Sequence, residues 1–593
     1  MAYSLQIKEL IYLMYNNEKK IINNLSIENS EKLNNAIIFR ENSKFSLAIN
    51  CLEEIQCNNL KNPIIYYNMA ITYYSYGNYH LTKNNYILAI NCYKKAISFF
   101  DGNQNNFLTD IYIKLAHCYQ NIKDYKNMKV SHESLTKLEN KPLISYGFLL
   151  YSKLCCADFN GRDELLNNIK EGLKMGSATI TPFTSILVTD DPKIQFLAAK
   201  NYCNEYMKIE KKFSSVHINK YKNKKIKVAY LSSDFHNHAT SHLMVDMLEK
   251  HNKDKFEYYC FSYGKNDNSE VSQRIRKTFD NFYLVNDKSD EEIASMIRDL
   301  EINITVDLKG HTKQNRLNIM SFRPSPIQVS YLGFPGTLGG QFVDYLIMDK
   351  YIINSSNRKF FSENIIYMPS SYQCNSNFSK DIQYHDREYF NLPKDKFILC
   401  SLNNSQKYNK KLLNSWAKIL TKNSNTVLWL LDDNDLVKEN ILILFASKNI
   451  DLKRIIFSPR VDTKEHLSRM SLADLFLDSF PCNAHTTASD ALLVDLPIIT
   501  LSGKSMSSRV TGSFLSVLNL EELIANNYQE YEKKINYYIS NQTKLAQIKQ
   551  KININKNLIL FNSEKISKDI EKAYEKIWNN FINGKKIADL KIK

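Results

Sequence analysis

The chain has 593 residues, of which 44% are apolar and 24% charged, enough for about three or four domains of ordinary size. This composition is that of an average globular protein and excludes collagen-like, disordered and membrane-spanning classes. The 11 cysteines form no C-x-x-C pair, so we predict reduced thiols rather than a disulfide framework or a zinc site. The first 20 residues lack a leader pattern, which predicts a cytoplasmic protein.

The net charge of +16 comes from 78 Lys and Arg against 62 Asp and Glu. Lysine is spread among abundant Asn and Ile, and basic clusters such as residues 220–227 are short. A nucleic-acid-binding protein concentrates its positive charge on one face or helix. We therefore predict no nucleic-acid partner.

From about residue 30 to 140 the apolar pattern is helical and partly self-similar. The pentapeptide LAINC at residues 47–51 returns at residues 88–92. A second echo pairs residues 69–70 and 76–79 with residues 115–116 and 121–125, as small residues followed by a turn and an aromatic. Such repeats are typical of stacked helix pairs, so we predict an all-α, tetratricopeptide-like repeat domain over residues 1–215. An ordinary helical bundle is the alternative.

After residue 220 the pattern changes to short apolar runs separated by amphipathic segments of 10–15 residues, which is typical of βαβ units. We predict strands at residues 227–231, 258–261, 304–308, 328–332, 397–402, 426–431, 454–457, 475–477 and 498–501. They form two groups, so we predict two Rossmann-like domains, residues 216–389 and 390–585, the second ending in a helix at residues 561–581. Ligands then bind at the carboxyl ends of the strands.

Two segments offer backbone groups to an anion at such strand ends. Glycine is scarce at 15 residues, yet five glycines lie within residues 310–340, where they favour either a ligand-binding loop or a tight structural turn. Residues 480–490, FPCNAHTTASD, lead into a helix, whose N-terminus attracts phosphate. In this second segment, Asp490 and the two threonines also fit a plain helix cap.

Two further segments carry side chains that suit acid–base or electrostatic chemistry. Three histidines lie within residues 236–242, directly after a predicted strand, and His238 suits proton transfer better than metal binding. Lys407 also follows a strand and can counter a negative ligand, although an exposed lysine is the common case. The run DDND at residues 432–435 is interpreted as a solvated loop rather than as a metal site.

Together these segments resemble a known family. YLSSDFHNHATSHLM at 230–244, RPSPIQVSYLGFPGT at 323–337 and CNAHTT at 482–487 are similar to the O-GlcNAc transferase family, glycosyltransferase family 41. The resemblance covers roughly residues 220–585. It implies a GT-B fold, two facing Rossmann-like domains, and inverting transfer of N-acetylglucosamine from UDP-GlcNAc to Ser or Thr hydroxyls of proteins. It implies no metal and no cofactor besides the donor substrate.

The resemblance also implies residue roles. His238 would be the general base and Lys407 would hold the diphosphate leaving group. The implied donor-binding residues are Asn404 beside Lys407; His485, Thr486 and Thr487 on the phosphates; Asp490 on the ribose; His466 stacked on uracil with Arg469 nearby; and Leu332, Gly333 and Cys482 around the sugar.

The sequence departs from the family pattern at Thr463, where a basic residue is common, and at Ser295, where some members have a carboxylate proposed as the base. Other members use GDP-fucose, or UDP-glucose with an Asn acceptor, and an inactive repeat scaffold is a further alternative. We expect a protein or peptide acceptor to bind through the repeat domain, no membrane span, and a possible homodimer.

Overall fold

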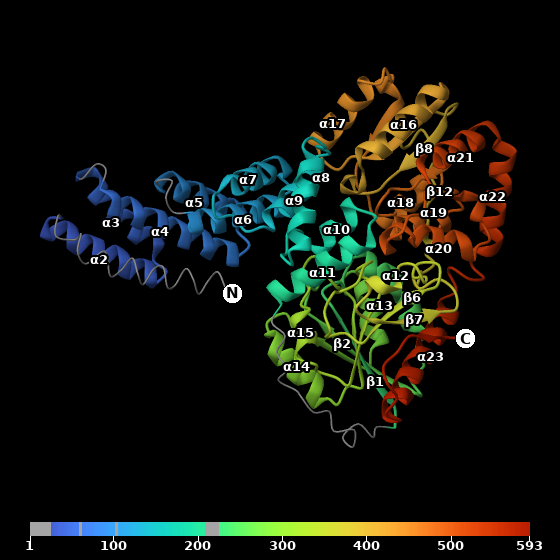
Figure 1. The fold of residues 1–593 in the computed structure, drawn as a ribbon, viewed down its shortest axis with the longest axis horizontal. Coiled ribbons are helices and arrows are strands. Elements are labelled where there is room, and N and C mark those ends of the chain that lie inside the picture. Colours follow the sequence, from blue (N-terminus) through green and yellow to red (C-terminus); the bar gives the residue numbers. More distant parts are fainter. Residues whose placement is uncertain (1–24, 59–61, 101–104, 208–223) are drawn as a thin grey trace. The chain divides into compact units, whose positions relative to one another are not determined.

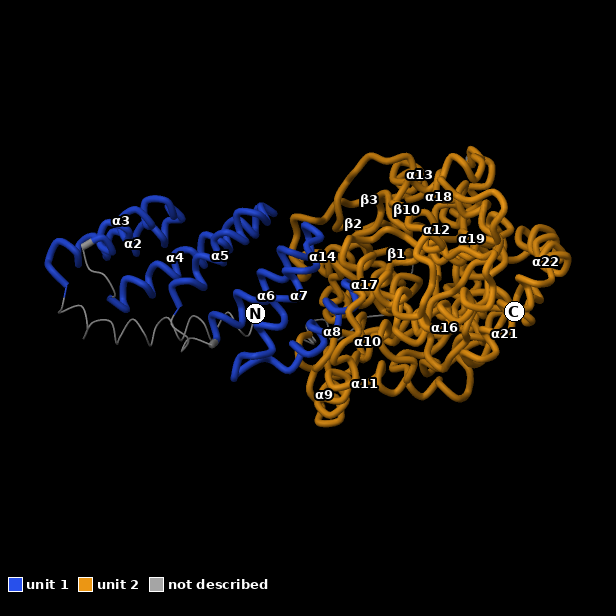
Figure 2. The backbone as a smooth tube through the Cα atoms, turned by 90° about the horizontal axis from the view of Figure 1, so that it is seen from above, with its two compact units in different colours: residues 1–156 blue, residues 157–593 orange. Residues whose placement is uncertain are grey.

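A computed structural model describes residues 25–58, 62–100, 105–207 and 224–593. The chain forms two compact units, Met1–Cys156 and Ala157–Lys593 (Figure 2). Among the described residues, no helix has the length and apolar character needed to cross a membrane.

The first unit consists of helices packed in consecutive pairs, α2 against α3, α4 against α5 and α6 against α7. Its apolar faces enclose a separate core that includes Leu52, Ile65 and Tyr93. The helices are α2 (Ile27–Glu41), α3 (Phe45–Asn58), α4 (Pro63–Thr82), α5 (Tyr86–Phe99), α6 (Asn105–Asn121), α7 (Tyr125–Lys137) and α8 (Ser145–Cys155).

The turns within the three helix pairs repeat one local structure. Ser43, Asn84 and Lys123 each have a positive φ, of 58°, 58° and 62°, and are spaced 41 and 39 residues apart. Two positions later an aromatic residue opens the next helix, as Phe45, Tyr86 and Tyr125 do. The repeated helix pairs agree with the tetratricopeptide-like prediction.

One turn was predicted in the wrong place. Residues 76–79 lie inside α4, which continues to Thr82, and Gly77 faces the ring of Tyr93 on α5. The small residue therefore serves close packing of two helices, and the chain turns at residues 83–85.

The second unit begins with three helices, α9 (Arg162–Lys174), α10 (Pro182–Val188) and α11 (Pro192–Tyr206). Thr181 and Asp191 cap α10 and α11, and a proline occupies the first turn of each, where its missing N–H costs nothing. These helices lie outside the first unit, which ends at Cys156. The predicted helical domain of residues 1–215 thus spans parts of both compact units.

Two parallel sheets follow (Figure 1). The first has the order β14-β7-β6-β5-β4-β1-β2-β3 and the second β10-β9-β8-β11-β12-β13. The strands are β1 (Ile226–Ser232), β2 (Phe256–Ser262), β3 (Asn281–Leu284), β4 (Ile304–Asp307), β5 (Ile327–Ser330), β6 (Tyr345–Asp349), β7 (Asn364–Met368), β8 (Phe397–Ser401), β9 (Thr426–Leu431), β10 (Ile455–Ser458), β11 (Leu475–Leu477), β12 (Ile498–Leu501), β13 (Ile524–Ala525) and β14 (Leu590–Lys591).

Helices connect the strands and cover the sheets, as parallel pairing requires. In the first half of the second unit, which contains the first sheet, they are α12 (Ala239–Glu249), α13 (Glu270–Thr278), α14 (Asp290–Asp299) and α15 (Asn318–Ser321). In the second half they are α16 (Lys410–Lys422), α17 (Asp435–Ala446), α18 (Thr463–Met470), α19 (Thr486–Leu493), α20 (Val510–Val517), α21 (Tyr528–Ser540) and α22 (Gln542–Asn555), followed by α23 (Ser563–Ile582).

The last helix returns to the first half, although the sequence assigned it to the second. Figure 1 shows α23, in red, beside the green and yellow elements of the first sheet. Tyr574 of α23 shares a hydrogen bond of 3.0 Å with Tyr230 of β1, and Glu571 lies 3.2 Å from His251. The two-residue strand β14 then pairs with β7. The chain thus crosses between the halves twice.

Candidate active site

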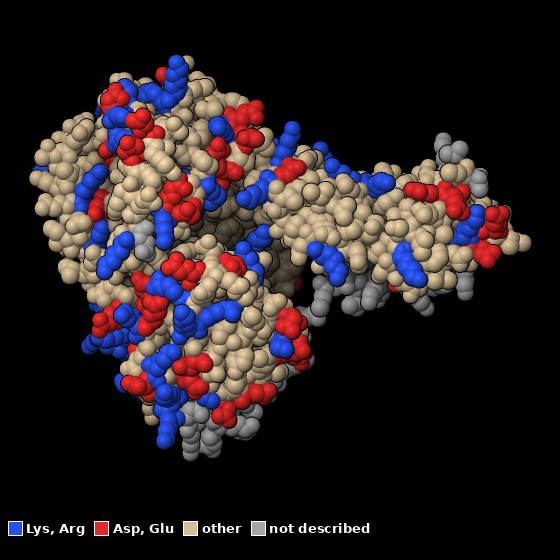
Figure 3. Space-filling model, turned by 180° about the vertical axis from the view of Figure 1, so that it is seen from behind, with Lys and Arg blue, Asp and Glu red and all other residues tan. Residues whose placement is uncertain are grey.

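A cavity of about 510 Å³ opens where the carboxyl ends of both sheets meet. On the face drawn in Figure 3, both basic and acidic side chains lie around the hollow between the two halves of the second unit. All the predicted site residues except Leu332 line this cavity. Leu332 is buried and has a φ of 71°, and it brings Gly333 to the wall.

Gly333 has a structural reason of its own to be glycine. A Cβ atom there would lie 1.9 Å from the carbonyl oxygen of Leu308, which no rotamer relieves because the clash is with backbone. Both interpretations of the glycine-rich segment therefore hold at this residue: it forms a tight turn, and it lines the cavity.

Lys407 lies at the end of a short 3₁₀ helix, η5 (Ser405–Lys407), that follows β8. Its ammonium donates to the carbonyl oxygens of Asn483, at 2.5 Å, and Ala484, at 3.3 Å. An ammonium has three N–H donors, so one remains for a ligand. The positive charge is thus held directly above the loop that leads into α19.

The loop before α19 is fixed from several sides. Asp478 accepts the N–H of Ala484 at 2.7 Å, and the ring Nε2 of His485 lies 3.0 Å from the Ser507 carbonyl oxygen. Burial and the nearby Lys407 lower the pKa of His485 to about 3, so the ring is neutral and Nε2 carries the proton that Ser507 accepts. His485 therefore supplies no positive charge; Lys407 and the α19 N-terminus do.

His466, Arg469 and Asp490 form a second group in the cavity. Arg469 is buried and donates to Nδ1 of His466 at 3.2 and 3.1 Å. Burial, aided by Arg469, lowers the pKa of His466 to about 3, so its ring is neutral with the proton on Nε2, 3.9 Å from Asp490. A neutral, fixed ring of this kind suits stacking on a base, and Arg469 orients the ring.

His238 caps the N-terminus of α12. Its Nδ1 accepts the N–H of Thr240 at 3.2 Å and lies 3.5 Å from the Asp234 carboxylate. The two contacts require opposite tautomers: the cap needs a lone pair on Nδ1, whereas a hydrogen bond to Asp234 needs a proton there. Only the second tautomer leaves a lone pair on Nε2 for proton abstraction. Burial lowers the pKa of His238, which favours a neutral ring in either case.

A buried ion pair lies behind His238. Lys309 donates to both carboxylate oxygens of Asp234 at 2.8 Å, and both residues are 4% exposed. Asp234 lies within the motif at residues 230–244 but was given no role, and Lys309 was not singled out, because a lysine two residues beyond β4 has no local pattern that predicts burial. The pair fixes a carboxylate beside the histidine ring.

Asp433 also differs from the prediction of a solvated loop. Its carboxylate accepts the backbone N–H and the hydroxyl of Ser405, both at 2.8 Å, and pairs with Arg460 at 2.6 Å. Arg460 contacts Asn404 as well and lines the cavity together with Thr463. The group joins the ends of β8, β9 and β10 and so supports Lys407 through η5. Arg460 thus places a basic side chain in this part of the cavity, although position 463, where a basic residue is common in the family, is a threonine.

Helix α10 forms one wall of the cavity through Phe183, Ile186 and Leu187. This wall was not predicted from the sequence, because the helical pattern placed the segment in the repeat domain. The capped, proline-initiated start at residues 181–182 was the available sign of a new element.

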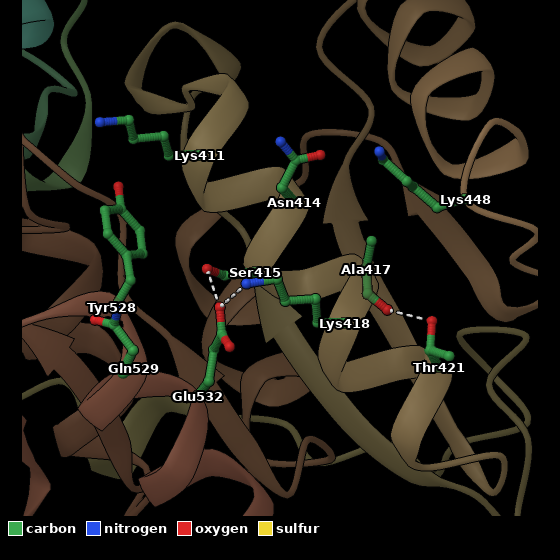
Figure 4. A pocket seen from close by; sticks show the side chains of 10 residues that line it. All are labelled: Lys411, Asn414, Ser415, Ala417, Lys418, Thr421, Lys448, Tyr528, Gln529 and Glu532. Atoms are coloured by element: carbon green, nitrogen blue, oxygen red, sulfur yellow. Dashed lines mark hydrogen bonds and ion pairs between the residues drawn. The ribbon is translucent and has the colours of Figure 1, made fainter.

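Other hollows of the second unit lie apart from these residues. One lies on the outer face of α16, between Lys411, Lys448 and Tyr528 (Figure 4), where Lys418 and Ser415 both contact Glu532. Another is shallow and contains Ser295 on α14. Neither contains a predicted site residue. Among the described residues, no three His, Cys, Asp or Glu side chains are grouped as a metal site would require.

Comparisons with known proteins agree on one family. The model of glycosyl transferase family 41 matches residues 177–378 and 372–570, a range that includes α10 and α11. The Arabidopsis thaliana protein SEC, named a probable UDP-N-acetylglucosamine–peptide N-acetylglucosaminyltransferase, is 34% identical over 377 residues, or 62% of this chain and 39% of SEC. A Caenorhabditis elegans enzyme of the same name, without "probable", is 25% identical over 478 residues, 61% of this chain and 41% of that protein.

A solved structure shares the fold. A lysine-to-methionine mutant of the O-GlcNAc transferase from Thermobaculum terrenum superposes with a TM-score of 0.68 at 17% identity, covering 94% of this chain and all of that one. The present chain spans about 40% of the length of the curated relatives. Two parallel sheets with a cavity between their carboxyl ends form the GT-B arrangement, and the match to the family model covers more than half of the sequence. The chain belongs to glycosyl transferase family 41.

Proposed function

We propose that the protein transfers N-acetylglucosamine from UDP-GlcNAc to Ser or Thr hydroxyls of proteins, with inversion at the anomeric carbon. The observation that carries this proposal is the position of Lys407: its ammonium lies over the loop that begins α19, in the same cavity as the neutral ring of His466 and the carboxyl group of Asp490. His466, Asp490 and Lys407 in turn match the base, the ribose and the phosphates of a nucleoside diphosphate. The names of the relatives support the choice of donor and acceptor.

The chemistry follows from where charge develops. The acceptor oxygen bonds to the anomeric carbon as the bond to the UDP oxygen breaks, and the electron pair of that bond stays on the diphosphate. Lys407 and the amides at the start of α19 stabilise this charge. They supply the positive charge that a metal ion supplies in other enzymes. We therefore propose UDP-GlcNAc as the only small molecule required, with no metal or further cofactor.

The proton of the acceptor hydroxyl goes to His238 in this proposal. The ring then needs its other proton on Nδ1, directed at Asp234, and gives up the cap on Thr240.

Thr486 and Thr487 at the first turn of α19 contact the phosphates, Asn404 lies beside Lys407, and Cys482, Gly333 and Leu332 surround the sugar. We further propose that the repeat unit binds the acceptor protein and that the reaction takes place in the cytoplasm. A homodimer stays a prediction.

Calorimetry with the full chain tests the donor assignment. We expect UDP and UDP-GlcNAc to bind with a Kd that EDTA leaves unchanged, and GDP to bind far more weakly, since the proposed donor is a uridine nucleotide. A lack of UDP binding by folded protein, or a requirement for a divalent metal, would contradict the proposal.

The same titration has an expected pH dependence. Burial raises the pKa of Asp490 to about 7, and ribose hydroxyls donate best to the ionised carboxylate. UDP-GlcNAc has no terminal phosphate that titrates in this range, so its affinity should rise from about pH 6 to about pH 8, and Asp490→Asn should abolish that rise. The effect on folding has the opposite sign: the neutral form is favoured in the folded state, so this group's contribution to stability is complete below its unfolded pKa and is lost as the pH rises through about 7.

A further inference from the structure

The connection between α10 and α11 is bonded to the second half of the second unit by one carboxylate, that of Asp190. Asp190 accepts the backbone N–H of Lys504 at 2.9 Å, the N–H of Ser505 at 3.0 Å and the hydroxyl of Ser508 at 2.5 Å. These donors all belong to the loop of residues 503–508 that follows β12. Three bonds on one side chain fix the conformation of this loop.

Gly503, the first residue of this loop, has no space for a side chain. A Cβ atom on Gly503 would lie 2.3 Å from the Asp190 carboxylate. From the other side, Arg509 donates to the carbonyl oxygen of Gly503 at 2.8 Å and to that of Tyr351, in the first half, at 2.6 and 2.9 Å. The loop is therefore held between the α10–α11 connection and the first sheet.

The same loop holds the segment that precedes α19. The carbonyl oxygen of Ser507 accepts the N–H of Asn483 at 2.9 Å and the ring N–H of His485 at 3.0 Å. Asn483 is also the residue whose carbonyl oxygen receives the Lys407 ammonium. A displacement of the loop of residues 503–508 would thus move the backbone on which both phosphate-contacting elements depend.

We propose that Asp190 is a positioning residue for donor binding: through the loop of residues 503–508 it sets the place of Asn483 and His485, and so of Lys407 and the α19 N-terminus. The inference rests on the proposed function, in that the ligand is a UDP-sugar. It makes the connection between α10 and α11 part of the donor site, although Asp190 itself lies outside the cavity that UDP would occupy.

The test measures UDP affinity in the full chain with Asp190→Ala, and with Asp191→Asn as the matched control. Asp191 is the next residue and caps α11 by accepting the N–H of Lys193 at 2.9 Å; Asn caps a helix as well as Asp, so the control loses the same charge without losing a contact. Gly503→Ala is a second variant that disturbs the same contact from the loop's side. UDP Kd, donor and acceptor KM, and Tm are measured for each.

We expect Asp190→Ala and Gly503→Ala to raise the UDP Kd and the donor KM by about tenfold, equivalent to one or two lost hydrogen bonds, with acceptor KM and the Asp191→Asn values unchanged. An unchanged UDP Kd in a folded Asp190 variant, whatever its Tm, overturns the inference and reduces Asp190 to a structural role. Failure of the wild-type chain to bind UDP is a separate outcome, since it refutes the proposed function first and the inference with it.

Discussion

Lys407→Met is expected to lower kcat by about 10²–10³-fold, the usual loss when a fixed group that stabilises developing charge is removed. The ammonium lies over the loop before α19, where the leaving diphosphate gains negative charge, and methionine keeps the length of the side chain without the charge. UDP affinity should fall much less than kcat, because the leaving group gains charge only as the glycosidic bond breaks.

Lys410→Met is the matched control for that variant. Lys410 is the first residue of α16, three positions further along, and lines a different hollow. It should retain wild-type kcat and KM. Steady-state rates with saturating donor separate the two variants, and a Lys407→Met enzyme with wild-type kcat would show that the ammonium does not stabilise the leaving group.

Lys309→Met is expected to lower the free energy of unfolding by about 3–5 kcal/mol, because it leaves a buried carboxylate without its partner. Asp234 is 4% exposed, and both its oxygens bind the Lys309 ammonium. Urea denaturation followed by circular dichroism measures the change. Lys277→Met, at an exposed position in the last turn of α13, should change stability by about 0.5 kcal/mol or less.

A double variant separates the lost ion pair from lost packing. Lys309→Met with Asp234→Leu removes both charges, and replacing a whole buried pair with apolar residues is often neutral or stabilising. The double variant should therefore recover much of the stability lost by Lys309→Met alone. If it were as unstable as the single variant, or if Lys309→Met itself cost nothing, the account of a buried, mutually dependent pair would be wrong.

Three fully buried strands are predicted to the residue, whereas β6, which is equally buried, and β7 are not predicted at all. Residues 426–431, 475–477 and 498–501 match β9, β11 and β12 from end to end, because a central parallel strand is apolar on both faces. The strand β3 is only partly buried along its length, and β13 and β14 have two residues each, so none of these three strands leaves a recognisable apolar run. The predicted strand at residues 328–332 ends too late because Leu332 turns the chain with a positive φ.

The cavity residues were predictable where a motif lies at a strand end, as with His238, Lys407 and residues 482–487. Residues that act through others were not. Asp433, Lys309 and Asp190 become meaningful only when loops from separate strands or helices meet, and no local pattern marks a carboxylate that will bind a distant backbone. The return of α23 to the first sheet has the same cause, since its amphipathic face fits either half.

The central claim is donor-dependent transfer to protein, and intact-protein mass spectrometry tests it most directly. The purified chain is incubated with proteins from its own host and, separately, with UDP-GlcNAc, UDP-glucose, UDP-galactose or GDP-fucose. The account predicts a mass gain of one N-acetylhexosamine on acceptor proteins with UDP-GlcNAc alone, lost in Lys407→Met and kept in Lys410→Met. A gain with another donor instead, or an equal gain with Lys407→Met, would contradict it.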